Sequence, residues 1–256
     1  MLFILLLISS ELWSQPVNFE GHSHNDYTHE KPLFDALEIG LTSIEIDIFL
    51  INGKIIVGHD EEDLKESDDL ESMYLVPIKK LISKRGDLFG DRDQKQVQLL
   101  IDLKMGGLEI LDTLHALLDN YSKLFQTSGL SKKWYPLKVI LSGDKVRYDV
   151  IDKLDYPYFF VDGRCSDIKK KIDTKKMPII SDKYTKYFKW TGEGKLRKCE
   201  VKKLRRIVKK VHKQNKKLRF WATPDNKNLW SHLVENGVDF INVDDLELFS
   251  NFKDEG

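Results

Sequence analysis

Short runs of apolar, β-branched and aromatic residues alternate along the chain with longer segments of helical periodicity. Most of the runs are nearly continuous in apolar residues, as expected for parallel strands that are buried on both faces. Eight runs predict strands, at residues 17–21, 43–50, 97–104, 137–141, 158–161, 178–181, 218–222 and 239–243. An additional short strand at 55–58 is predicted to pair with the second strand through a turn at Asn52 and Gly53.

Helical patterns fill the spaces between these strands. The segments are residues 32–39, 108–125, 145–154 and 200–215, and the last is the clearest because Val201, Leu204, Val208 and Val211 form one apolar stripe in a basic helix. Pro32 suits a first helical turn, and Gly40 and Gly237 stand where helices should end.

Eight strands separated mostly by helices predict an α/β fold, a (β/α)₈ TIM barrel. A single domain over residues 16–256 has the length that this fold requires. A doubly wound open sheet is the alternative, but no GxGxxG or Walker-type loop follows any of the strands.

The amino-terminal residues have a different pattern. Residues 1–8 are unbroken apolar, far short of the ~20 that a membrane-spanning helix needs. Small polar residues follow at Ser9, Ser10 and Ser14, so residues 1–15 predict a signal peptide, although a basic first segment is missing. A buried first strand is the alternative. We therefore expect a secreted or periplasmic protein whose mature chain has no transmembrane helix.

Charge is balanced overall but segregated along the chain. The 41 basic and 41 acidic residues give no net charge, and so no general reason to expect a nucleic-acid partner. Residues 164–219, however, hold 22 Lys or Arg against five Asp or Glu, a net charge of +17. A solvated outer helix with lysine-rich loops explains this segment. A more specific hypothesis is that the segment contacts an anionic membrane or surface polymer. No nucleic-acid recognition motif accompanies the charge, so we do not expect a nucleic-acid partner.

The two cysteines, Cys165 and Cys199, are too few for a disulfide framework and lack the spacing of a metal site. Export would permit a disulfide between them, and the sequence leaves that pairing open.

Polar residues gather where the predicted strands end, which is the face that carries the active site in a (β/α)₈ barrel. They are the segment from His22 to Asp26, Glu45 and Asp47, His59 and Asp60, Asp102 and Lys104, Trp221 with Thr223 and Asp225, and Asp244 with Asp245. Each of them could also be an ordinary capping or hydrogen-bonding residue.

The carboxylates point to a cation site. The i, i+2 spacing of Glu45 and Asp47 puts both on the inner face of their strand, because three isoleucines fill the other face. Two like charges inside a barrel need a counter-charge, and Asp102 adds a third carboxylate from the next strand. Three carboxylates without cysteine suit Mg²⁺ or Ca²⁺ better than zinc. A purely structural network is the alternative.

Two histidines could flank a substrate bound at such a cation. One follows strand one and the other, His59, follows the added strand. In a displacement at phosphorus, one imidazole takes a proton or attacks while the other protonates the leaving oxygen, and Lys104 neutralises phosphoryl charge. Histidine fits because its ordinary pKa of about 6.5 is near working pH.

These residues resemble a known family. GHSHND, SIEIDIFLINGKIIVGHD and LLIDLK are similar to motifs of the glycerophosphodiester phosphodiesterase superfamily of phospholipase-C-like barrels. HSHNDY, PLFDAL, RFWATPD and GVDFINVDDL resemble the branch related to the altered-inheritance-of-mitochondria proteins, and GH, ExD and DLK also resemble the spider-venom sphingomyelinase D enzymes. The resemblance covers most of residues 18–249.

The resemblance implies a role for each matching residue. It makes Glu45, Asp47 and Asp102 the metal ligands, His59 the second catalytic histidine, Lys104 a phosphate contact and Trp221 an aromatic wall of the substrate pocket. His22 matches the first catalytic histidine by its preceding glycine, and His24 competes for that role. The chain lacks the His-Arg and Glu-Asn-Thr motifs of the glycerophosphodiesterases, and Asn25 or Asp26 is the candidate to replace their contacts.

Three functional hypotheses follow. The first is a metal-dependent phosphoric diester hydrolase acting on a phospholipid or a glycerol- or inositol-type phosphodiester. The second is a phospholipase-D-type lyase that uses the same site and releases a cyclic phosphate. The third is a non-catalytic barrel that binds an anionic surface polymer. None of them requires an obligate protein partner.

Overall fold

Eight parallel strands close into a barrel in the computed structural model, which describes residues 19–90, 95–128, 133–143, 148–154 and 156–255. Around the barrel the order is β1, β2, β4, β5, β6, β7, β8 and β9, and β9 pairs with β1 to close it. The strands are β1 Glu20–Ser23, β2 Ser43–Ile51, β4 Val97–Leu103, β5 Leu137–Ser142, β6 Phe159–Gly163, β7 Ile179–Lys183, β8 Lys217–Trp221 and β9 Phe240–Val243. The predicted TIM barrel is confirmed.

A short hairpin extends the barrel at β2. Strand β3, Lys54–Val57, runs antiparallel to the second half of β2, from the pair Ile51 and Lys54 to the pair Ile48 and Val57. The turn between them has Asn52 at φ 50° and Gly53 at φ 75°, the left-handed geometry that an Asn-Gly hairpin adopts. The predicted pairing is confirmed, and the hairpin carries His59 back to the barrel mouth.

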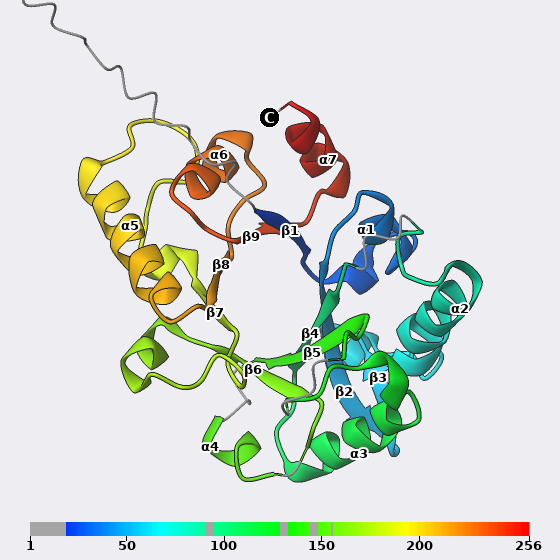
Figure 1. Cartoon of the computed structure of the whole chain (residues 1–256). Helices are drawn as coiled ribbons and strands as arrows, with labels where there is room; N and C mark the ends of the chain where they lie inside the picture. The colour runs from blue at the N-terminus through cyan, green and yellow to red at the C-terminus, as the bar shows by residue number, and fades with distance from the viewer. Residues whose placement is uncertain (1–18, 91–94, 129–132, 144–147, 155, 256) are drawn as a thin grey trace, which may run out of the picture.

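Helices form a ring outside the strands (Figure 1). They are α1 Phe34–Glu38, α2 Val76–Arg85, α3 Leu108–Asp119, α4 Tyr148–Ile151, α5 Lys198–His212, α6 Lys227–Glu235 and α7 Leu246–Asp254. Short 3₁₀ turns at Asp26–Thr28, Glu61–Asp63, Ser122–Leu124, Cys165–Lys170 and Tyr184–Lys186 and a π-helical turn at Glu71–Leu75 complete the connections. Within the described residues, no helix is long and apolar enough to cross a membrane.

Two apolar clusters support the barrel. The larger one lies between strands and helices and includes the outward face of β2, where Ile44, Ile46 and Ile48 are fully buried. The smaller one joins Ile140, Phe160, Ile179 and Phe240. Because Ile140 shares a strand face with the pocket residue Ser142, we place this small cluster inside the barrel. It forms an apolar plug beneath a polar upper interior.

The structure corrects several element boundaries. β1 continues to Ser23, so His22 lies within the strand instead of after it. Helix α1 begins at Phe34, two residues beyond Pro32, and α3 ends at Asp119, before a separate 3₁₀ turn. Gly40 and Gly237 follow their helices with positive φ as expected. The predicted signal peptide at 1–15 lies outside the described residues, as do residues 17–18 of the predicted first strand and 145–147 of the predicted fourth helix.

The basic segment is only partly an outer surface. Helix α5 does lie outside the barrel, where Leu204, Val208 and Val211 are buried and its lysines face solvent. Arg219 and Lys216, at the end of the same segment, are instead buried. Both cysteines are free thiols.

Candidate active site

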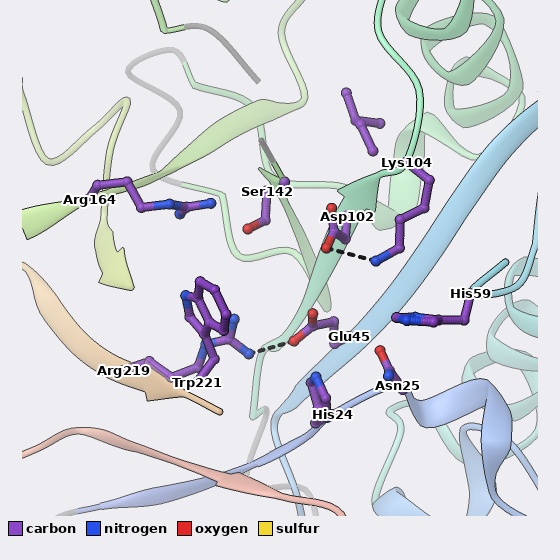
Figure 2. Close-up of a pocket in the computed structure, with 12 residues that line it drawn as sticks. His24, Asn25, Glu45, His59, Asp102, Lys104, Ser142, Arg164, Arg219 and Trp221 are labelled. Carbon is purple, nitrogen blue, oxygen red and sulfur yellow. Dashed lines mark hydrogen bonds and ion pairs between the residues drawn. The ribbon is translucent and has the colours of Figure 1, made fainter. Parts of the chain in front are cut away.

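A cavity of about 350 Å³ opens at the carboxyl ends of the barrel strands. Figure 2 shows its polar side chains converging from opposite walls. It is lined by His24, Asn25, Glu45, His59, Asp102, Leu103, Lys104, Ser142, Gly143, Arg164, Arg219 and Trp221. Seven of the ten residues given a candidate role from the sequence therefore line one cavity. The other three are His22, Asp26 and Asp47, which are fully buried.

Three carboxylates meet on one side of this cavity. Glu45 and Asp47 project from β2, and Asp102 is the partner of Asp47 across the β2–β4 pairing. One oxygen from each carboxylate lies within 4.8 Å of the other two. The register of two parallel strands thus brings together the trio that the sequence predicted.

Asp47 is fully buried and its two oxygens differ. Oδ2 accepts from the Tyr27 hydroxyl at 2.7 Å and pairs with Lys104 Nζ at 2.8 Å and His59 Nδ1 at 2.9 Å. Oδ1 is buried and has no hydrogen-bond partner among the described residues. A buried carboxylate oxygen without a partner is costly, and here it belongs to a cluster of hard oxygen donors. The trio therefore fits a divalent cation.

Protein cations supply part of the counter-charge. Arg219 Nη1 lies 2.5 Å from Glu45 Oε2, and although burial opposes ionisation, this guanidinium holds the pKa of Glu45 well below its usual range. Burial raises the pKa of Asp102, which Lys104 counters from 3.3 Å. Two cations face three carboxylates, so one negative charge remains for a bound cation to offset.

His22 lies beneath the cavity and does not line it. The ring is fully buried, with Nδ1 2.6 Å from Ser43 Oγ and Nε2 2.6 Å from Glu45 Oε2. Arg219 also contacts Nε2. Burial, assisted by the Arg219 charge, lowers the pKa of His22 to about 3. Both ring nitrogens are therefore occupied within the protein, and the ring is uncharged at neutral pH.

His24, two residues further along, reaches the cavity. Its Nδ1 lies 2.6 Å from Asp244 Oδ1. Burial lowers the pKa of His24, but the Asp244 hydrogen bond and the Glu45 charge outweigh it and raise the pKa above its ordinary value. Asn25 lines the cavity beside it. Asp26 is instead fully buried and accepts from Ser23, Leu33 and Tyr74, so Asp26 cannot supply the substrate contact considered for it.

His59 enters the cavity at the end of the β2–β3 hairpin, which neighbours β1 in the barrel. Its side chain is 57% exposed, and its Nδ1 is held by Asp47. His24 and His59 therefore share one feature: a carboxylate binds Nδ1, so the Nε2 of each ring is the nitrogen that can meet a ligand.

Five lining residues were not identified from the sequence. Leu103 and Gly143 are apolar, and the three polar ones are Ser142, Arg164 and Arg219. Ser142 ends β5 and donates to Asp162 at 2.8 Å, and Arg164, just after β6, pairs with the same Asp162 oxygen at 2.8 Å. Arg219 shares the inner face of β8 with Trp221. The i, i+2 spacing from Trp221 was the signal that could have identified Arg219.

Fold and site together define a TIM barrel with one polar cavity at the carboxyl ends of its strands. The chain belongs to the family of the AIM6-like phosphodiesterase domain, whose model matches residues 11–162. Altered inheritance of mitochondria protein 6 of Eremothecium gossypii is 28% identical over 283 residues, which cover 93% of this chain and 70% of that protein. The homologue of that protein in Arthroderma benhamiae is 28% identical over 260 residues, 88% of this chain and 81% of its own length.

Solved structures share the fold at low sequence identity. A glycerophosphodiester phosphodiesterase from Parabacteroides distasonis superposes with a TM-score of 0.54 at 15% identity, over 93% of this chain and 98% of its own. Phosphatidylinositol-specific phospholipase C from Listeria monocytogenes superposes with a TM-score of 0.53 at 12% identity, over 94% of each chain. These likenesses establish the barrel architecture.

Proposed function

We propose that this chain is a divalent-cation-dependent phosphodiesterase that hydrolyses a phospholipid or a glycerol- or inositol-type phosphodiester. The observation that carries the proposal is the arrangement of His24 and His59. Both rings enter one cavity beside the acidic trio, and both are anchored at Nδ1 by a carboxylate. Two imidazoles that present Nε2 toward a common space suit paired acid and base work.

Glu45, Asp47 and Asp102 are the residues that would hold the cation. Their oxygen-only donor set suits Mg²⁺ or Ca²⁺. When bound, such a cation acts as a Lewis acid that offsets charge on the phosphoryl oxygens. Lys104 lies between Asp47 and Asp102 and supplies a second positive charge at the same place.

In hydrolysis, His59 removes a proton from the attacking water as its oxygen bonds to phosphorus. His24 gives a proton to the ester oxygen as the P–O bond breaks, and the products are an alcohol and a phosphate monoester. The raised pKa of His24 suits the acid, since it keeps the ring protonated closer to neutral pH. His22, uncharged and enclosed, serves to hold Glu45.

Phosphorus NMR of a phosphodiester panel tests the proposal. We expect turnover with Mg²⁺ or Ca²⁺ that a chelator abolishes. His24→Asn and His59→Asn should each lower the rate by about 10²–10⁴-fold, the usual contribution of a general acid or base. His212→Asn is the matched control, because His212 lies on the outer helix α5, where it pairs with Asp239, and does not line the cavity.

The other hypotheses predict different results. If a cyclic phosphate accumulates and persists as the product, the reaction is that of a lyase and not hydrolysis. The absence of any cation-dependent turnover, together with polymer binding that His59→Ala and chelator leave intact, would identify a non-catalytic barrel.

A further inference from the structure

The cavity wall beyond the acidic trio has a chemistry of its own. Arg164 and Trp221 form it at the ends of β6 and β8, and Ser142, the partner of Asp102 in the β4–β5 register, joins it to the trio. Figure 2 shows Arg164 reaching toward Ser142 across the cavity from His59. A phosphodiester with its phosphoryl group beside the trio would direct one of its two substituents toward this wall. The wall is therefore where the headgroup alcohol would be recognised.

Arg164 is anchored from below. Asp162 is buried, and its Oδ2 accepts from both Arg164 Nη1 and Ser142 Oγ at 2.8 Å. This contact orients the guanidinium, while Arg164 still lines the cavity. A guanidinium fixed in this way is suited to planar anions such as a carboxylate, or to phosphate oxygens.

The aromatic side of the wall already has a cation. Lys183 Nζ lies 5.7 Å from the centre of the Trp221 ring. In the register of β7 and β8, Lys183 and Trp221 are direct partners. Lys183 is exposed, and no carboxylate of the described residues forms an ion pair with it. A quaternary ammonium group is recognised by an open aromatic face, and here a lysine ammonium competes for that face and repels a second cation.

We propose that this wall selects phosphodiesters whose headgroup alcohol carries a second acidic group, a carboxylate or a phosphate, and rejects quaternary ammonium headgroups. The inference rests on the proposed function and names its substrate class. Arg164 and Lys183 both belong to the +17 segment at residues 164–219, so part of that charge serves the cavity.

Three matched diesters test the selectivity. They are glycerol 3-phosphate esterified to choline, to ethylene glycol and to glycolic acid, which differ mainly in headgroup charge. We expect kcat/KM to be highest for the glycolate ester and lowest for the choline ester, with about a tenfold ratio between them for one or two charge contacts in a half-exposed site. Lys183→Gln should lower this ratio by about fivefold, and Arg164→Gln should raise KM for the glycolate ester more than for the other two.

Lys186→Gln is the control variant. Lys186 is also exposed and near Lys183, but it pairs with Asp182 and lies over Tyr187 instead of Trp221. It should leave the ratio as in the unmodified chain. The same headgroups on diacylglycerol phosphates in vesicles form a second arm, and the arm with the faster turnover identifies whether the acidic diester is a lipid or a soluble molecule.

A choline ester hydrolysed as fast as the glycolate ester in both arms would overturn the selectivity, as would equal effects of Lys183→Gln and Lys186→Gln. These results differ from failure of the proposed function, in which none of the three esters is hydrolysed with any cation.

Discussion

His22 and His24 are only two positions apart, yet their identical side chains lie in different environments. His22 lies in β1, and His24, the first residue after the strand, still bonds to β9 through its backbone and lies on the same side. His22 lies at the level of Glu45 and Arg219, with both nitrogens bonded, and His24 lies one level higher, where the barrel opens. Local sequence favoured His22 through its preceding glycine. The depth of each ring depends on where β1 ends, which the strand pairing determines.

The raised pKa of His24 gives a pH prediction. A ring that must donate a proton loses function as pH rises through its pKa. The alkaline limb of the kcat/KM profile should therefore report the pKa of His24. This limb should fall at a higher pH than it would for an unperturbed histidine. Asp244→Asn removes the hydrogen bond that raises this pKa and should move the limb to lower pH. The measurement is a pH–rate profile at saturating cation. An alkaline limb that is identical in the unmodified chain and in Asp244→Asn would contradict the assignment of His24 as the acid.

The same shift has a consequence for stability. Because the folded-state pKa of His24 is raised, the charged ring stabilises the fold at pH below its ordinary value, and this contribution is lost as pH rises through the folded-state pKa.

The residues of the site differ in how far the sequence could predict them. Glu45, Asp47 and Asp102 were predictable because a charged residue within an apolar strand is unusual. Arg164 was not, because it follows β6 within a basic stretch where one more arginine carries no signal. Its place in the cavity depends on the closure of the barrel, and so does that of Ser142.

The β2–β3 hairpin is the element on which the position of His59 depends. An Asn-Gly turn between two apolar runs was enough to predict it, since Gly53 takes a φ of 75° that other residues resist. Gly53→Ala should therefore destabilise the fold by about 1–2 kcal/mol, the cost of a left-handed non-glycine residue. It should also lower kcat/KM, because the hairpin holds His59.

Gly194→Ala is the matched control for this prediction. Gly194 has φ 68°, lies in the β7–α5 connection, and a Cβ on either glycine would meet nothing within 4 Å. Both variants should lower the midpoint of urea unfolding to a similar extent, and only Gly53→Ala should reduce turnover. Equal turnover in the two variants would show that the hairpin does not position His59.

Element boundaries were less predictable than the elements themselves. β1 continues into the polar residues His22 and Ser23 because pairing with β2 and β9 on its two sides outweighs the polar composition. α1 begins two residues after Pro32 because Leu33 adopts a φ of 68°, which interrupts the helical path. Both corrections depend on tertiary contacts that a local pattern does not contain.

At the scale of the whole molecule, the alternation of strands and helices was sufficient to predict the barrel, because few folds accept eight buried strands separated by helices. The charge distribution was harder to interpret. Helix α5 presents its lysines to solvent, whereas Arg164 and Arg219 of the same segment face the cavity. The +17 segment therefore supplies both a basic outer helix and two arginines of a cavity in which basic and acidic side chains lie side by side.

The central claim is that Glu45, Asp47 and Asp102 hold one divalent cation. Electron paramagnetic resonance of Mn²⁺ titrated into the chelator-treated protein tests it directly. The account predicts one Mn²⁺ per chain, displaced by Mg²⁺, with affinity lowered at least about tenfold by Asp47→Asn or Asp102→Asn, since each removes one charged ligand. Asp60→Asn should bind Mn²⁺ with the affinity of the unmodified chain. It removes an exposed carboxylate beside His59 at the same end of the barrel. Equal Mn²⁺ affinity in folded Asp47→Asn, Asp102→Asn and Asp60→Asn, confirmed by circular dichroism, would contradict the account.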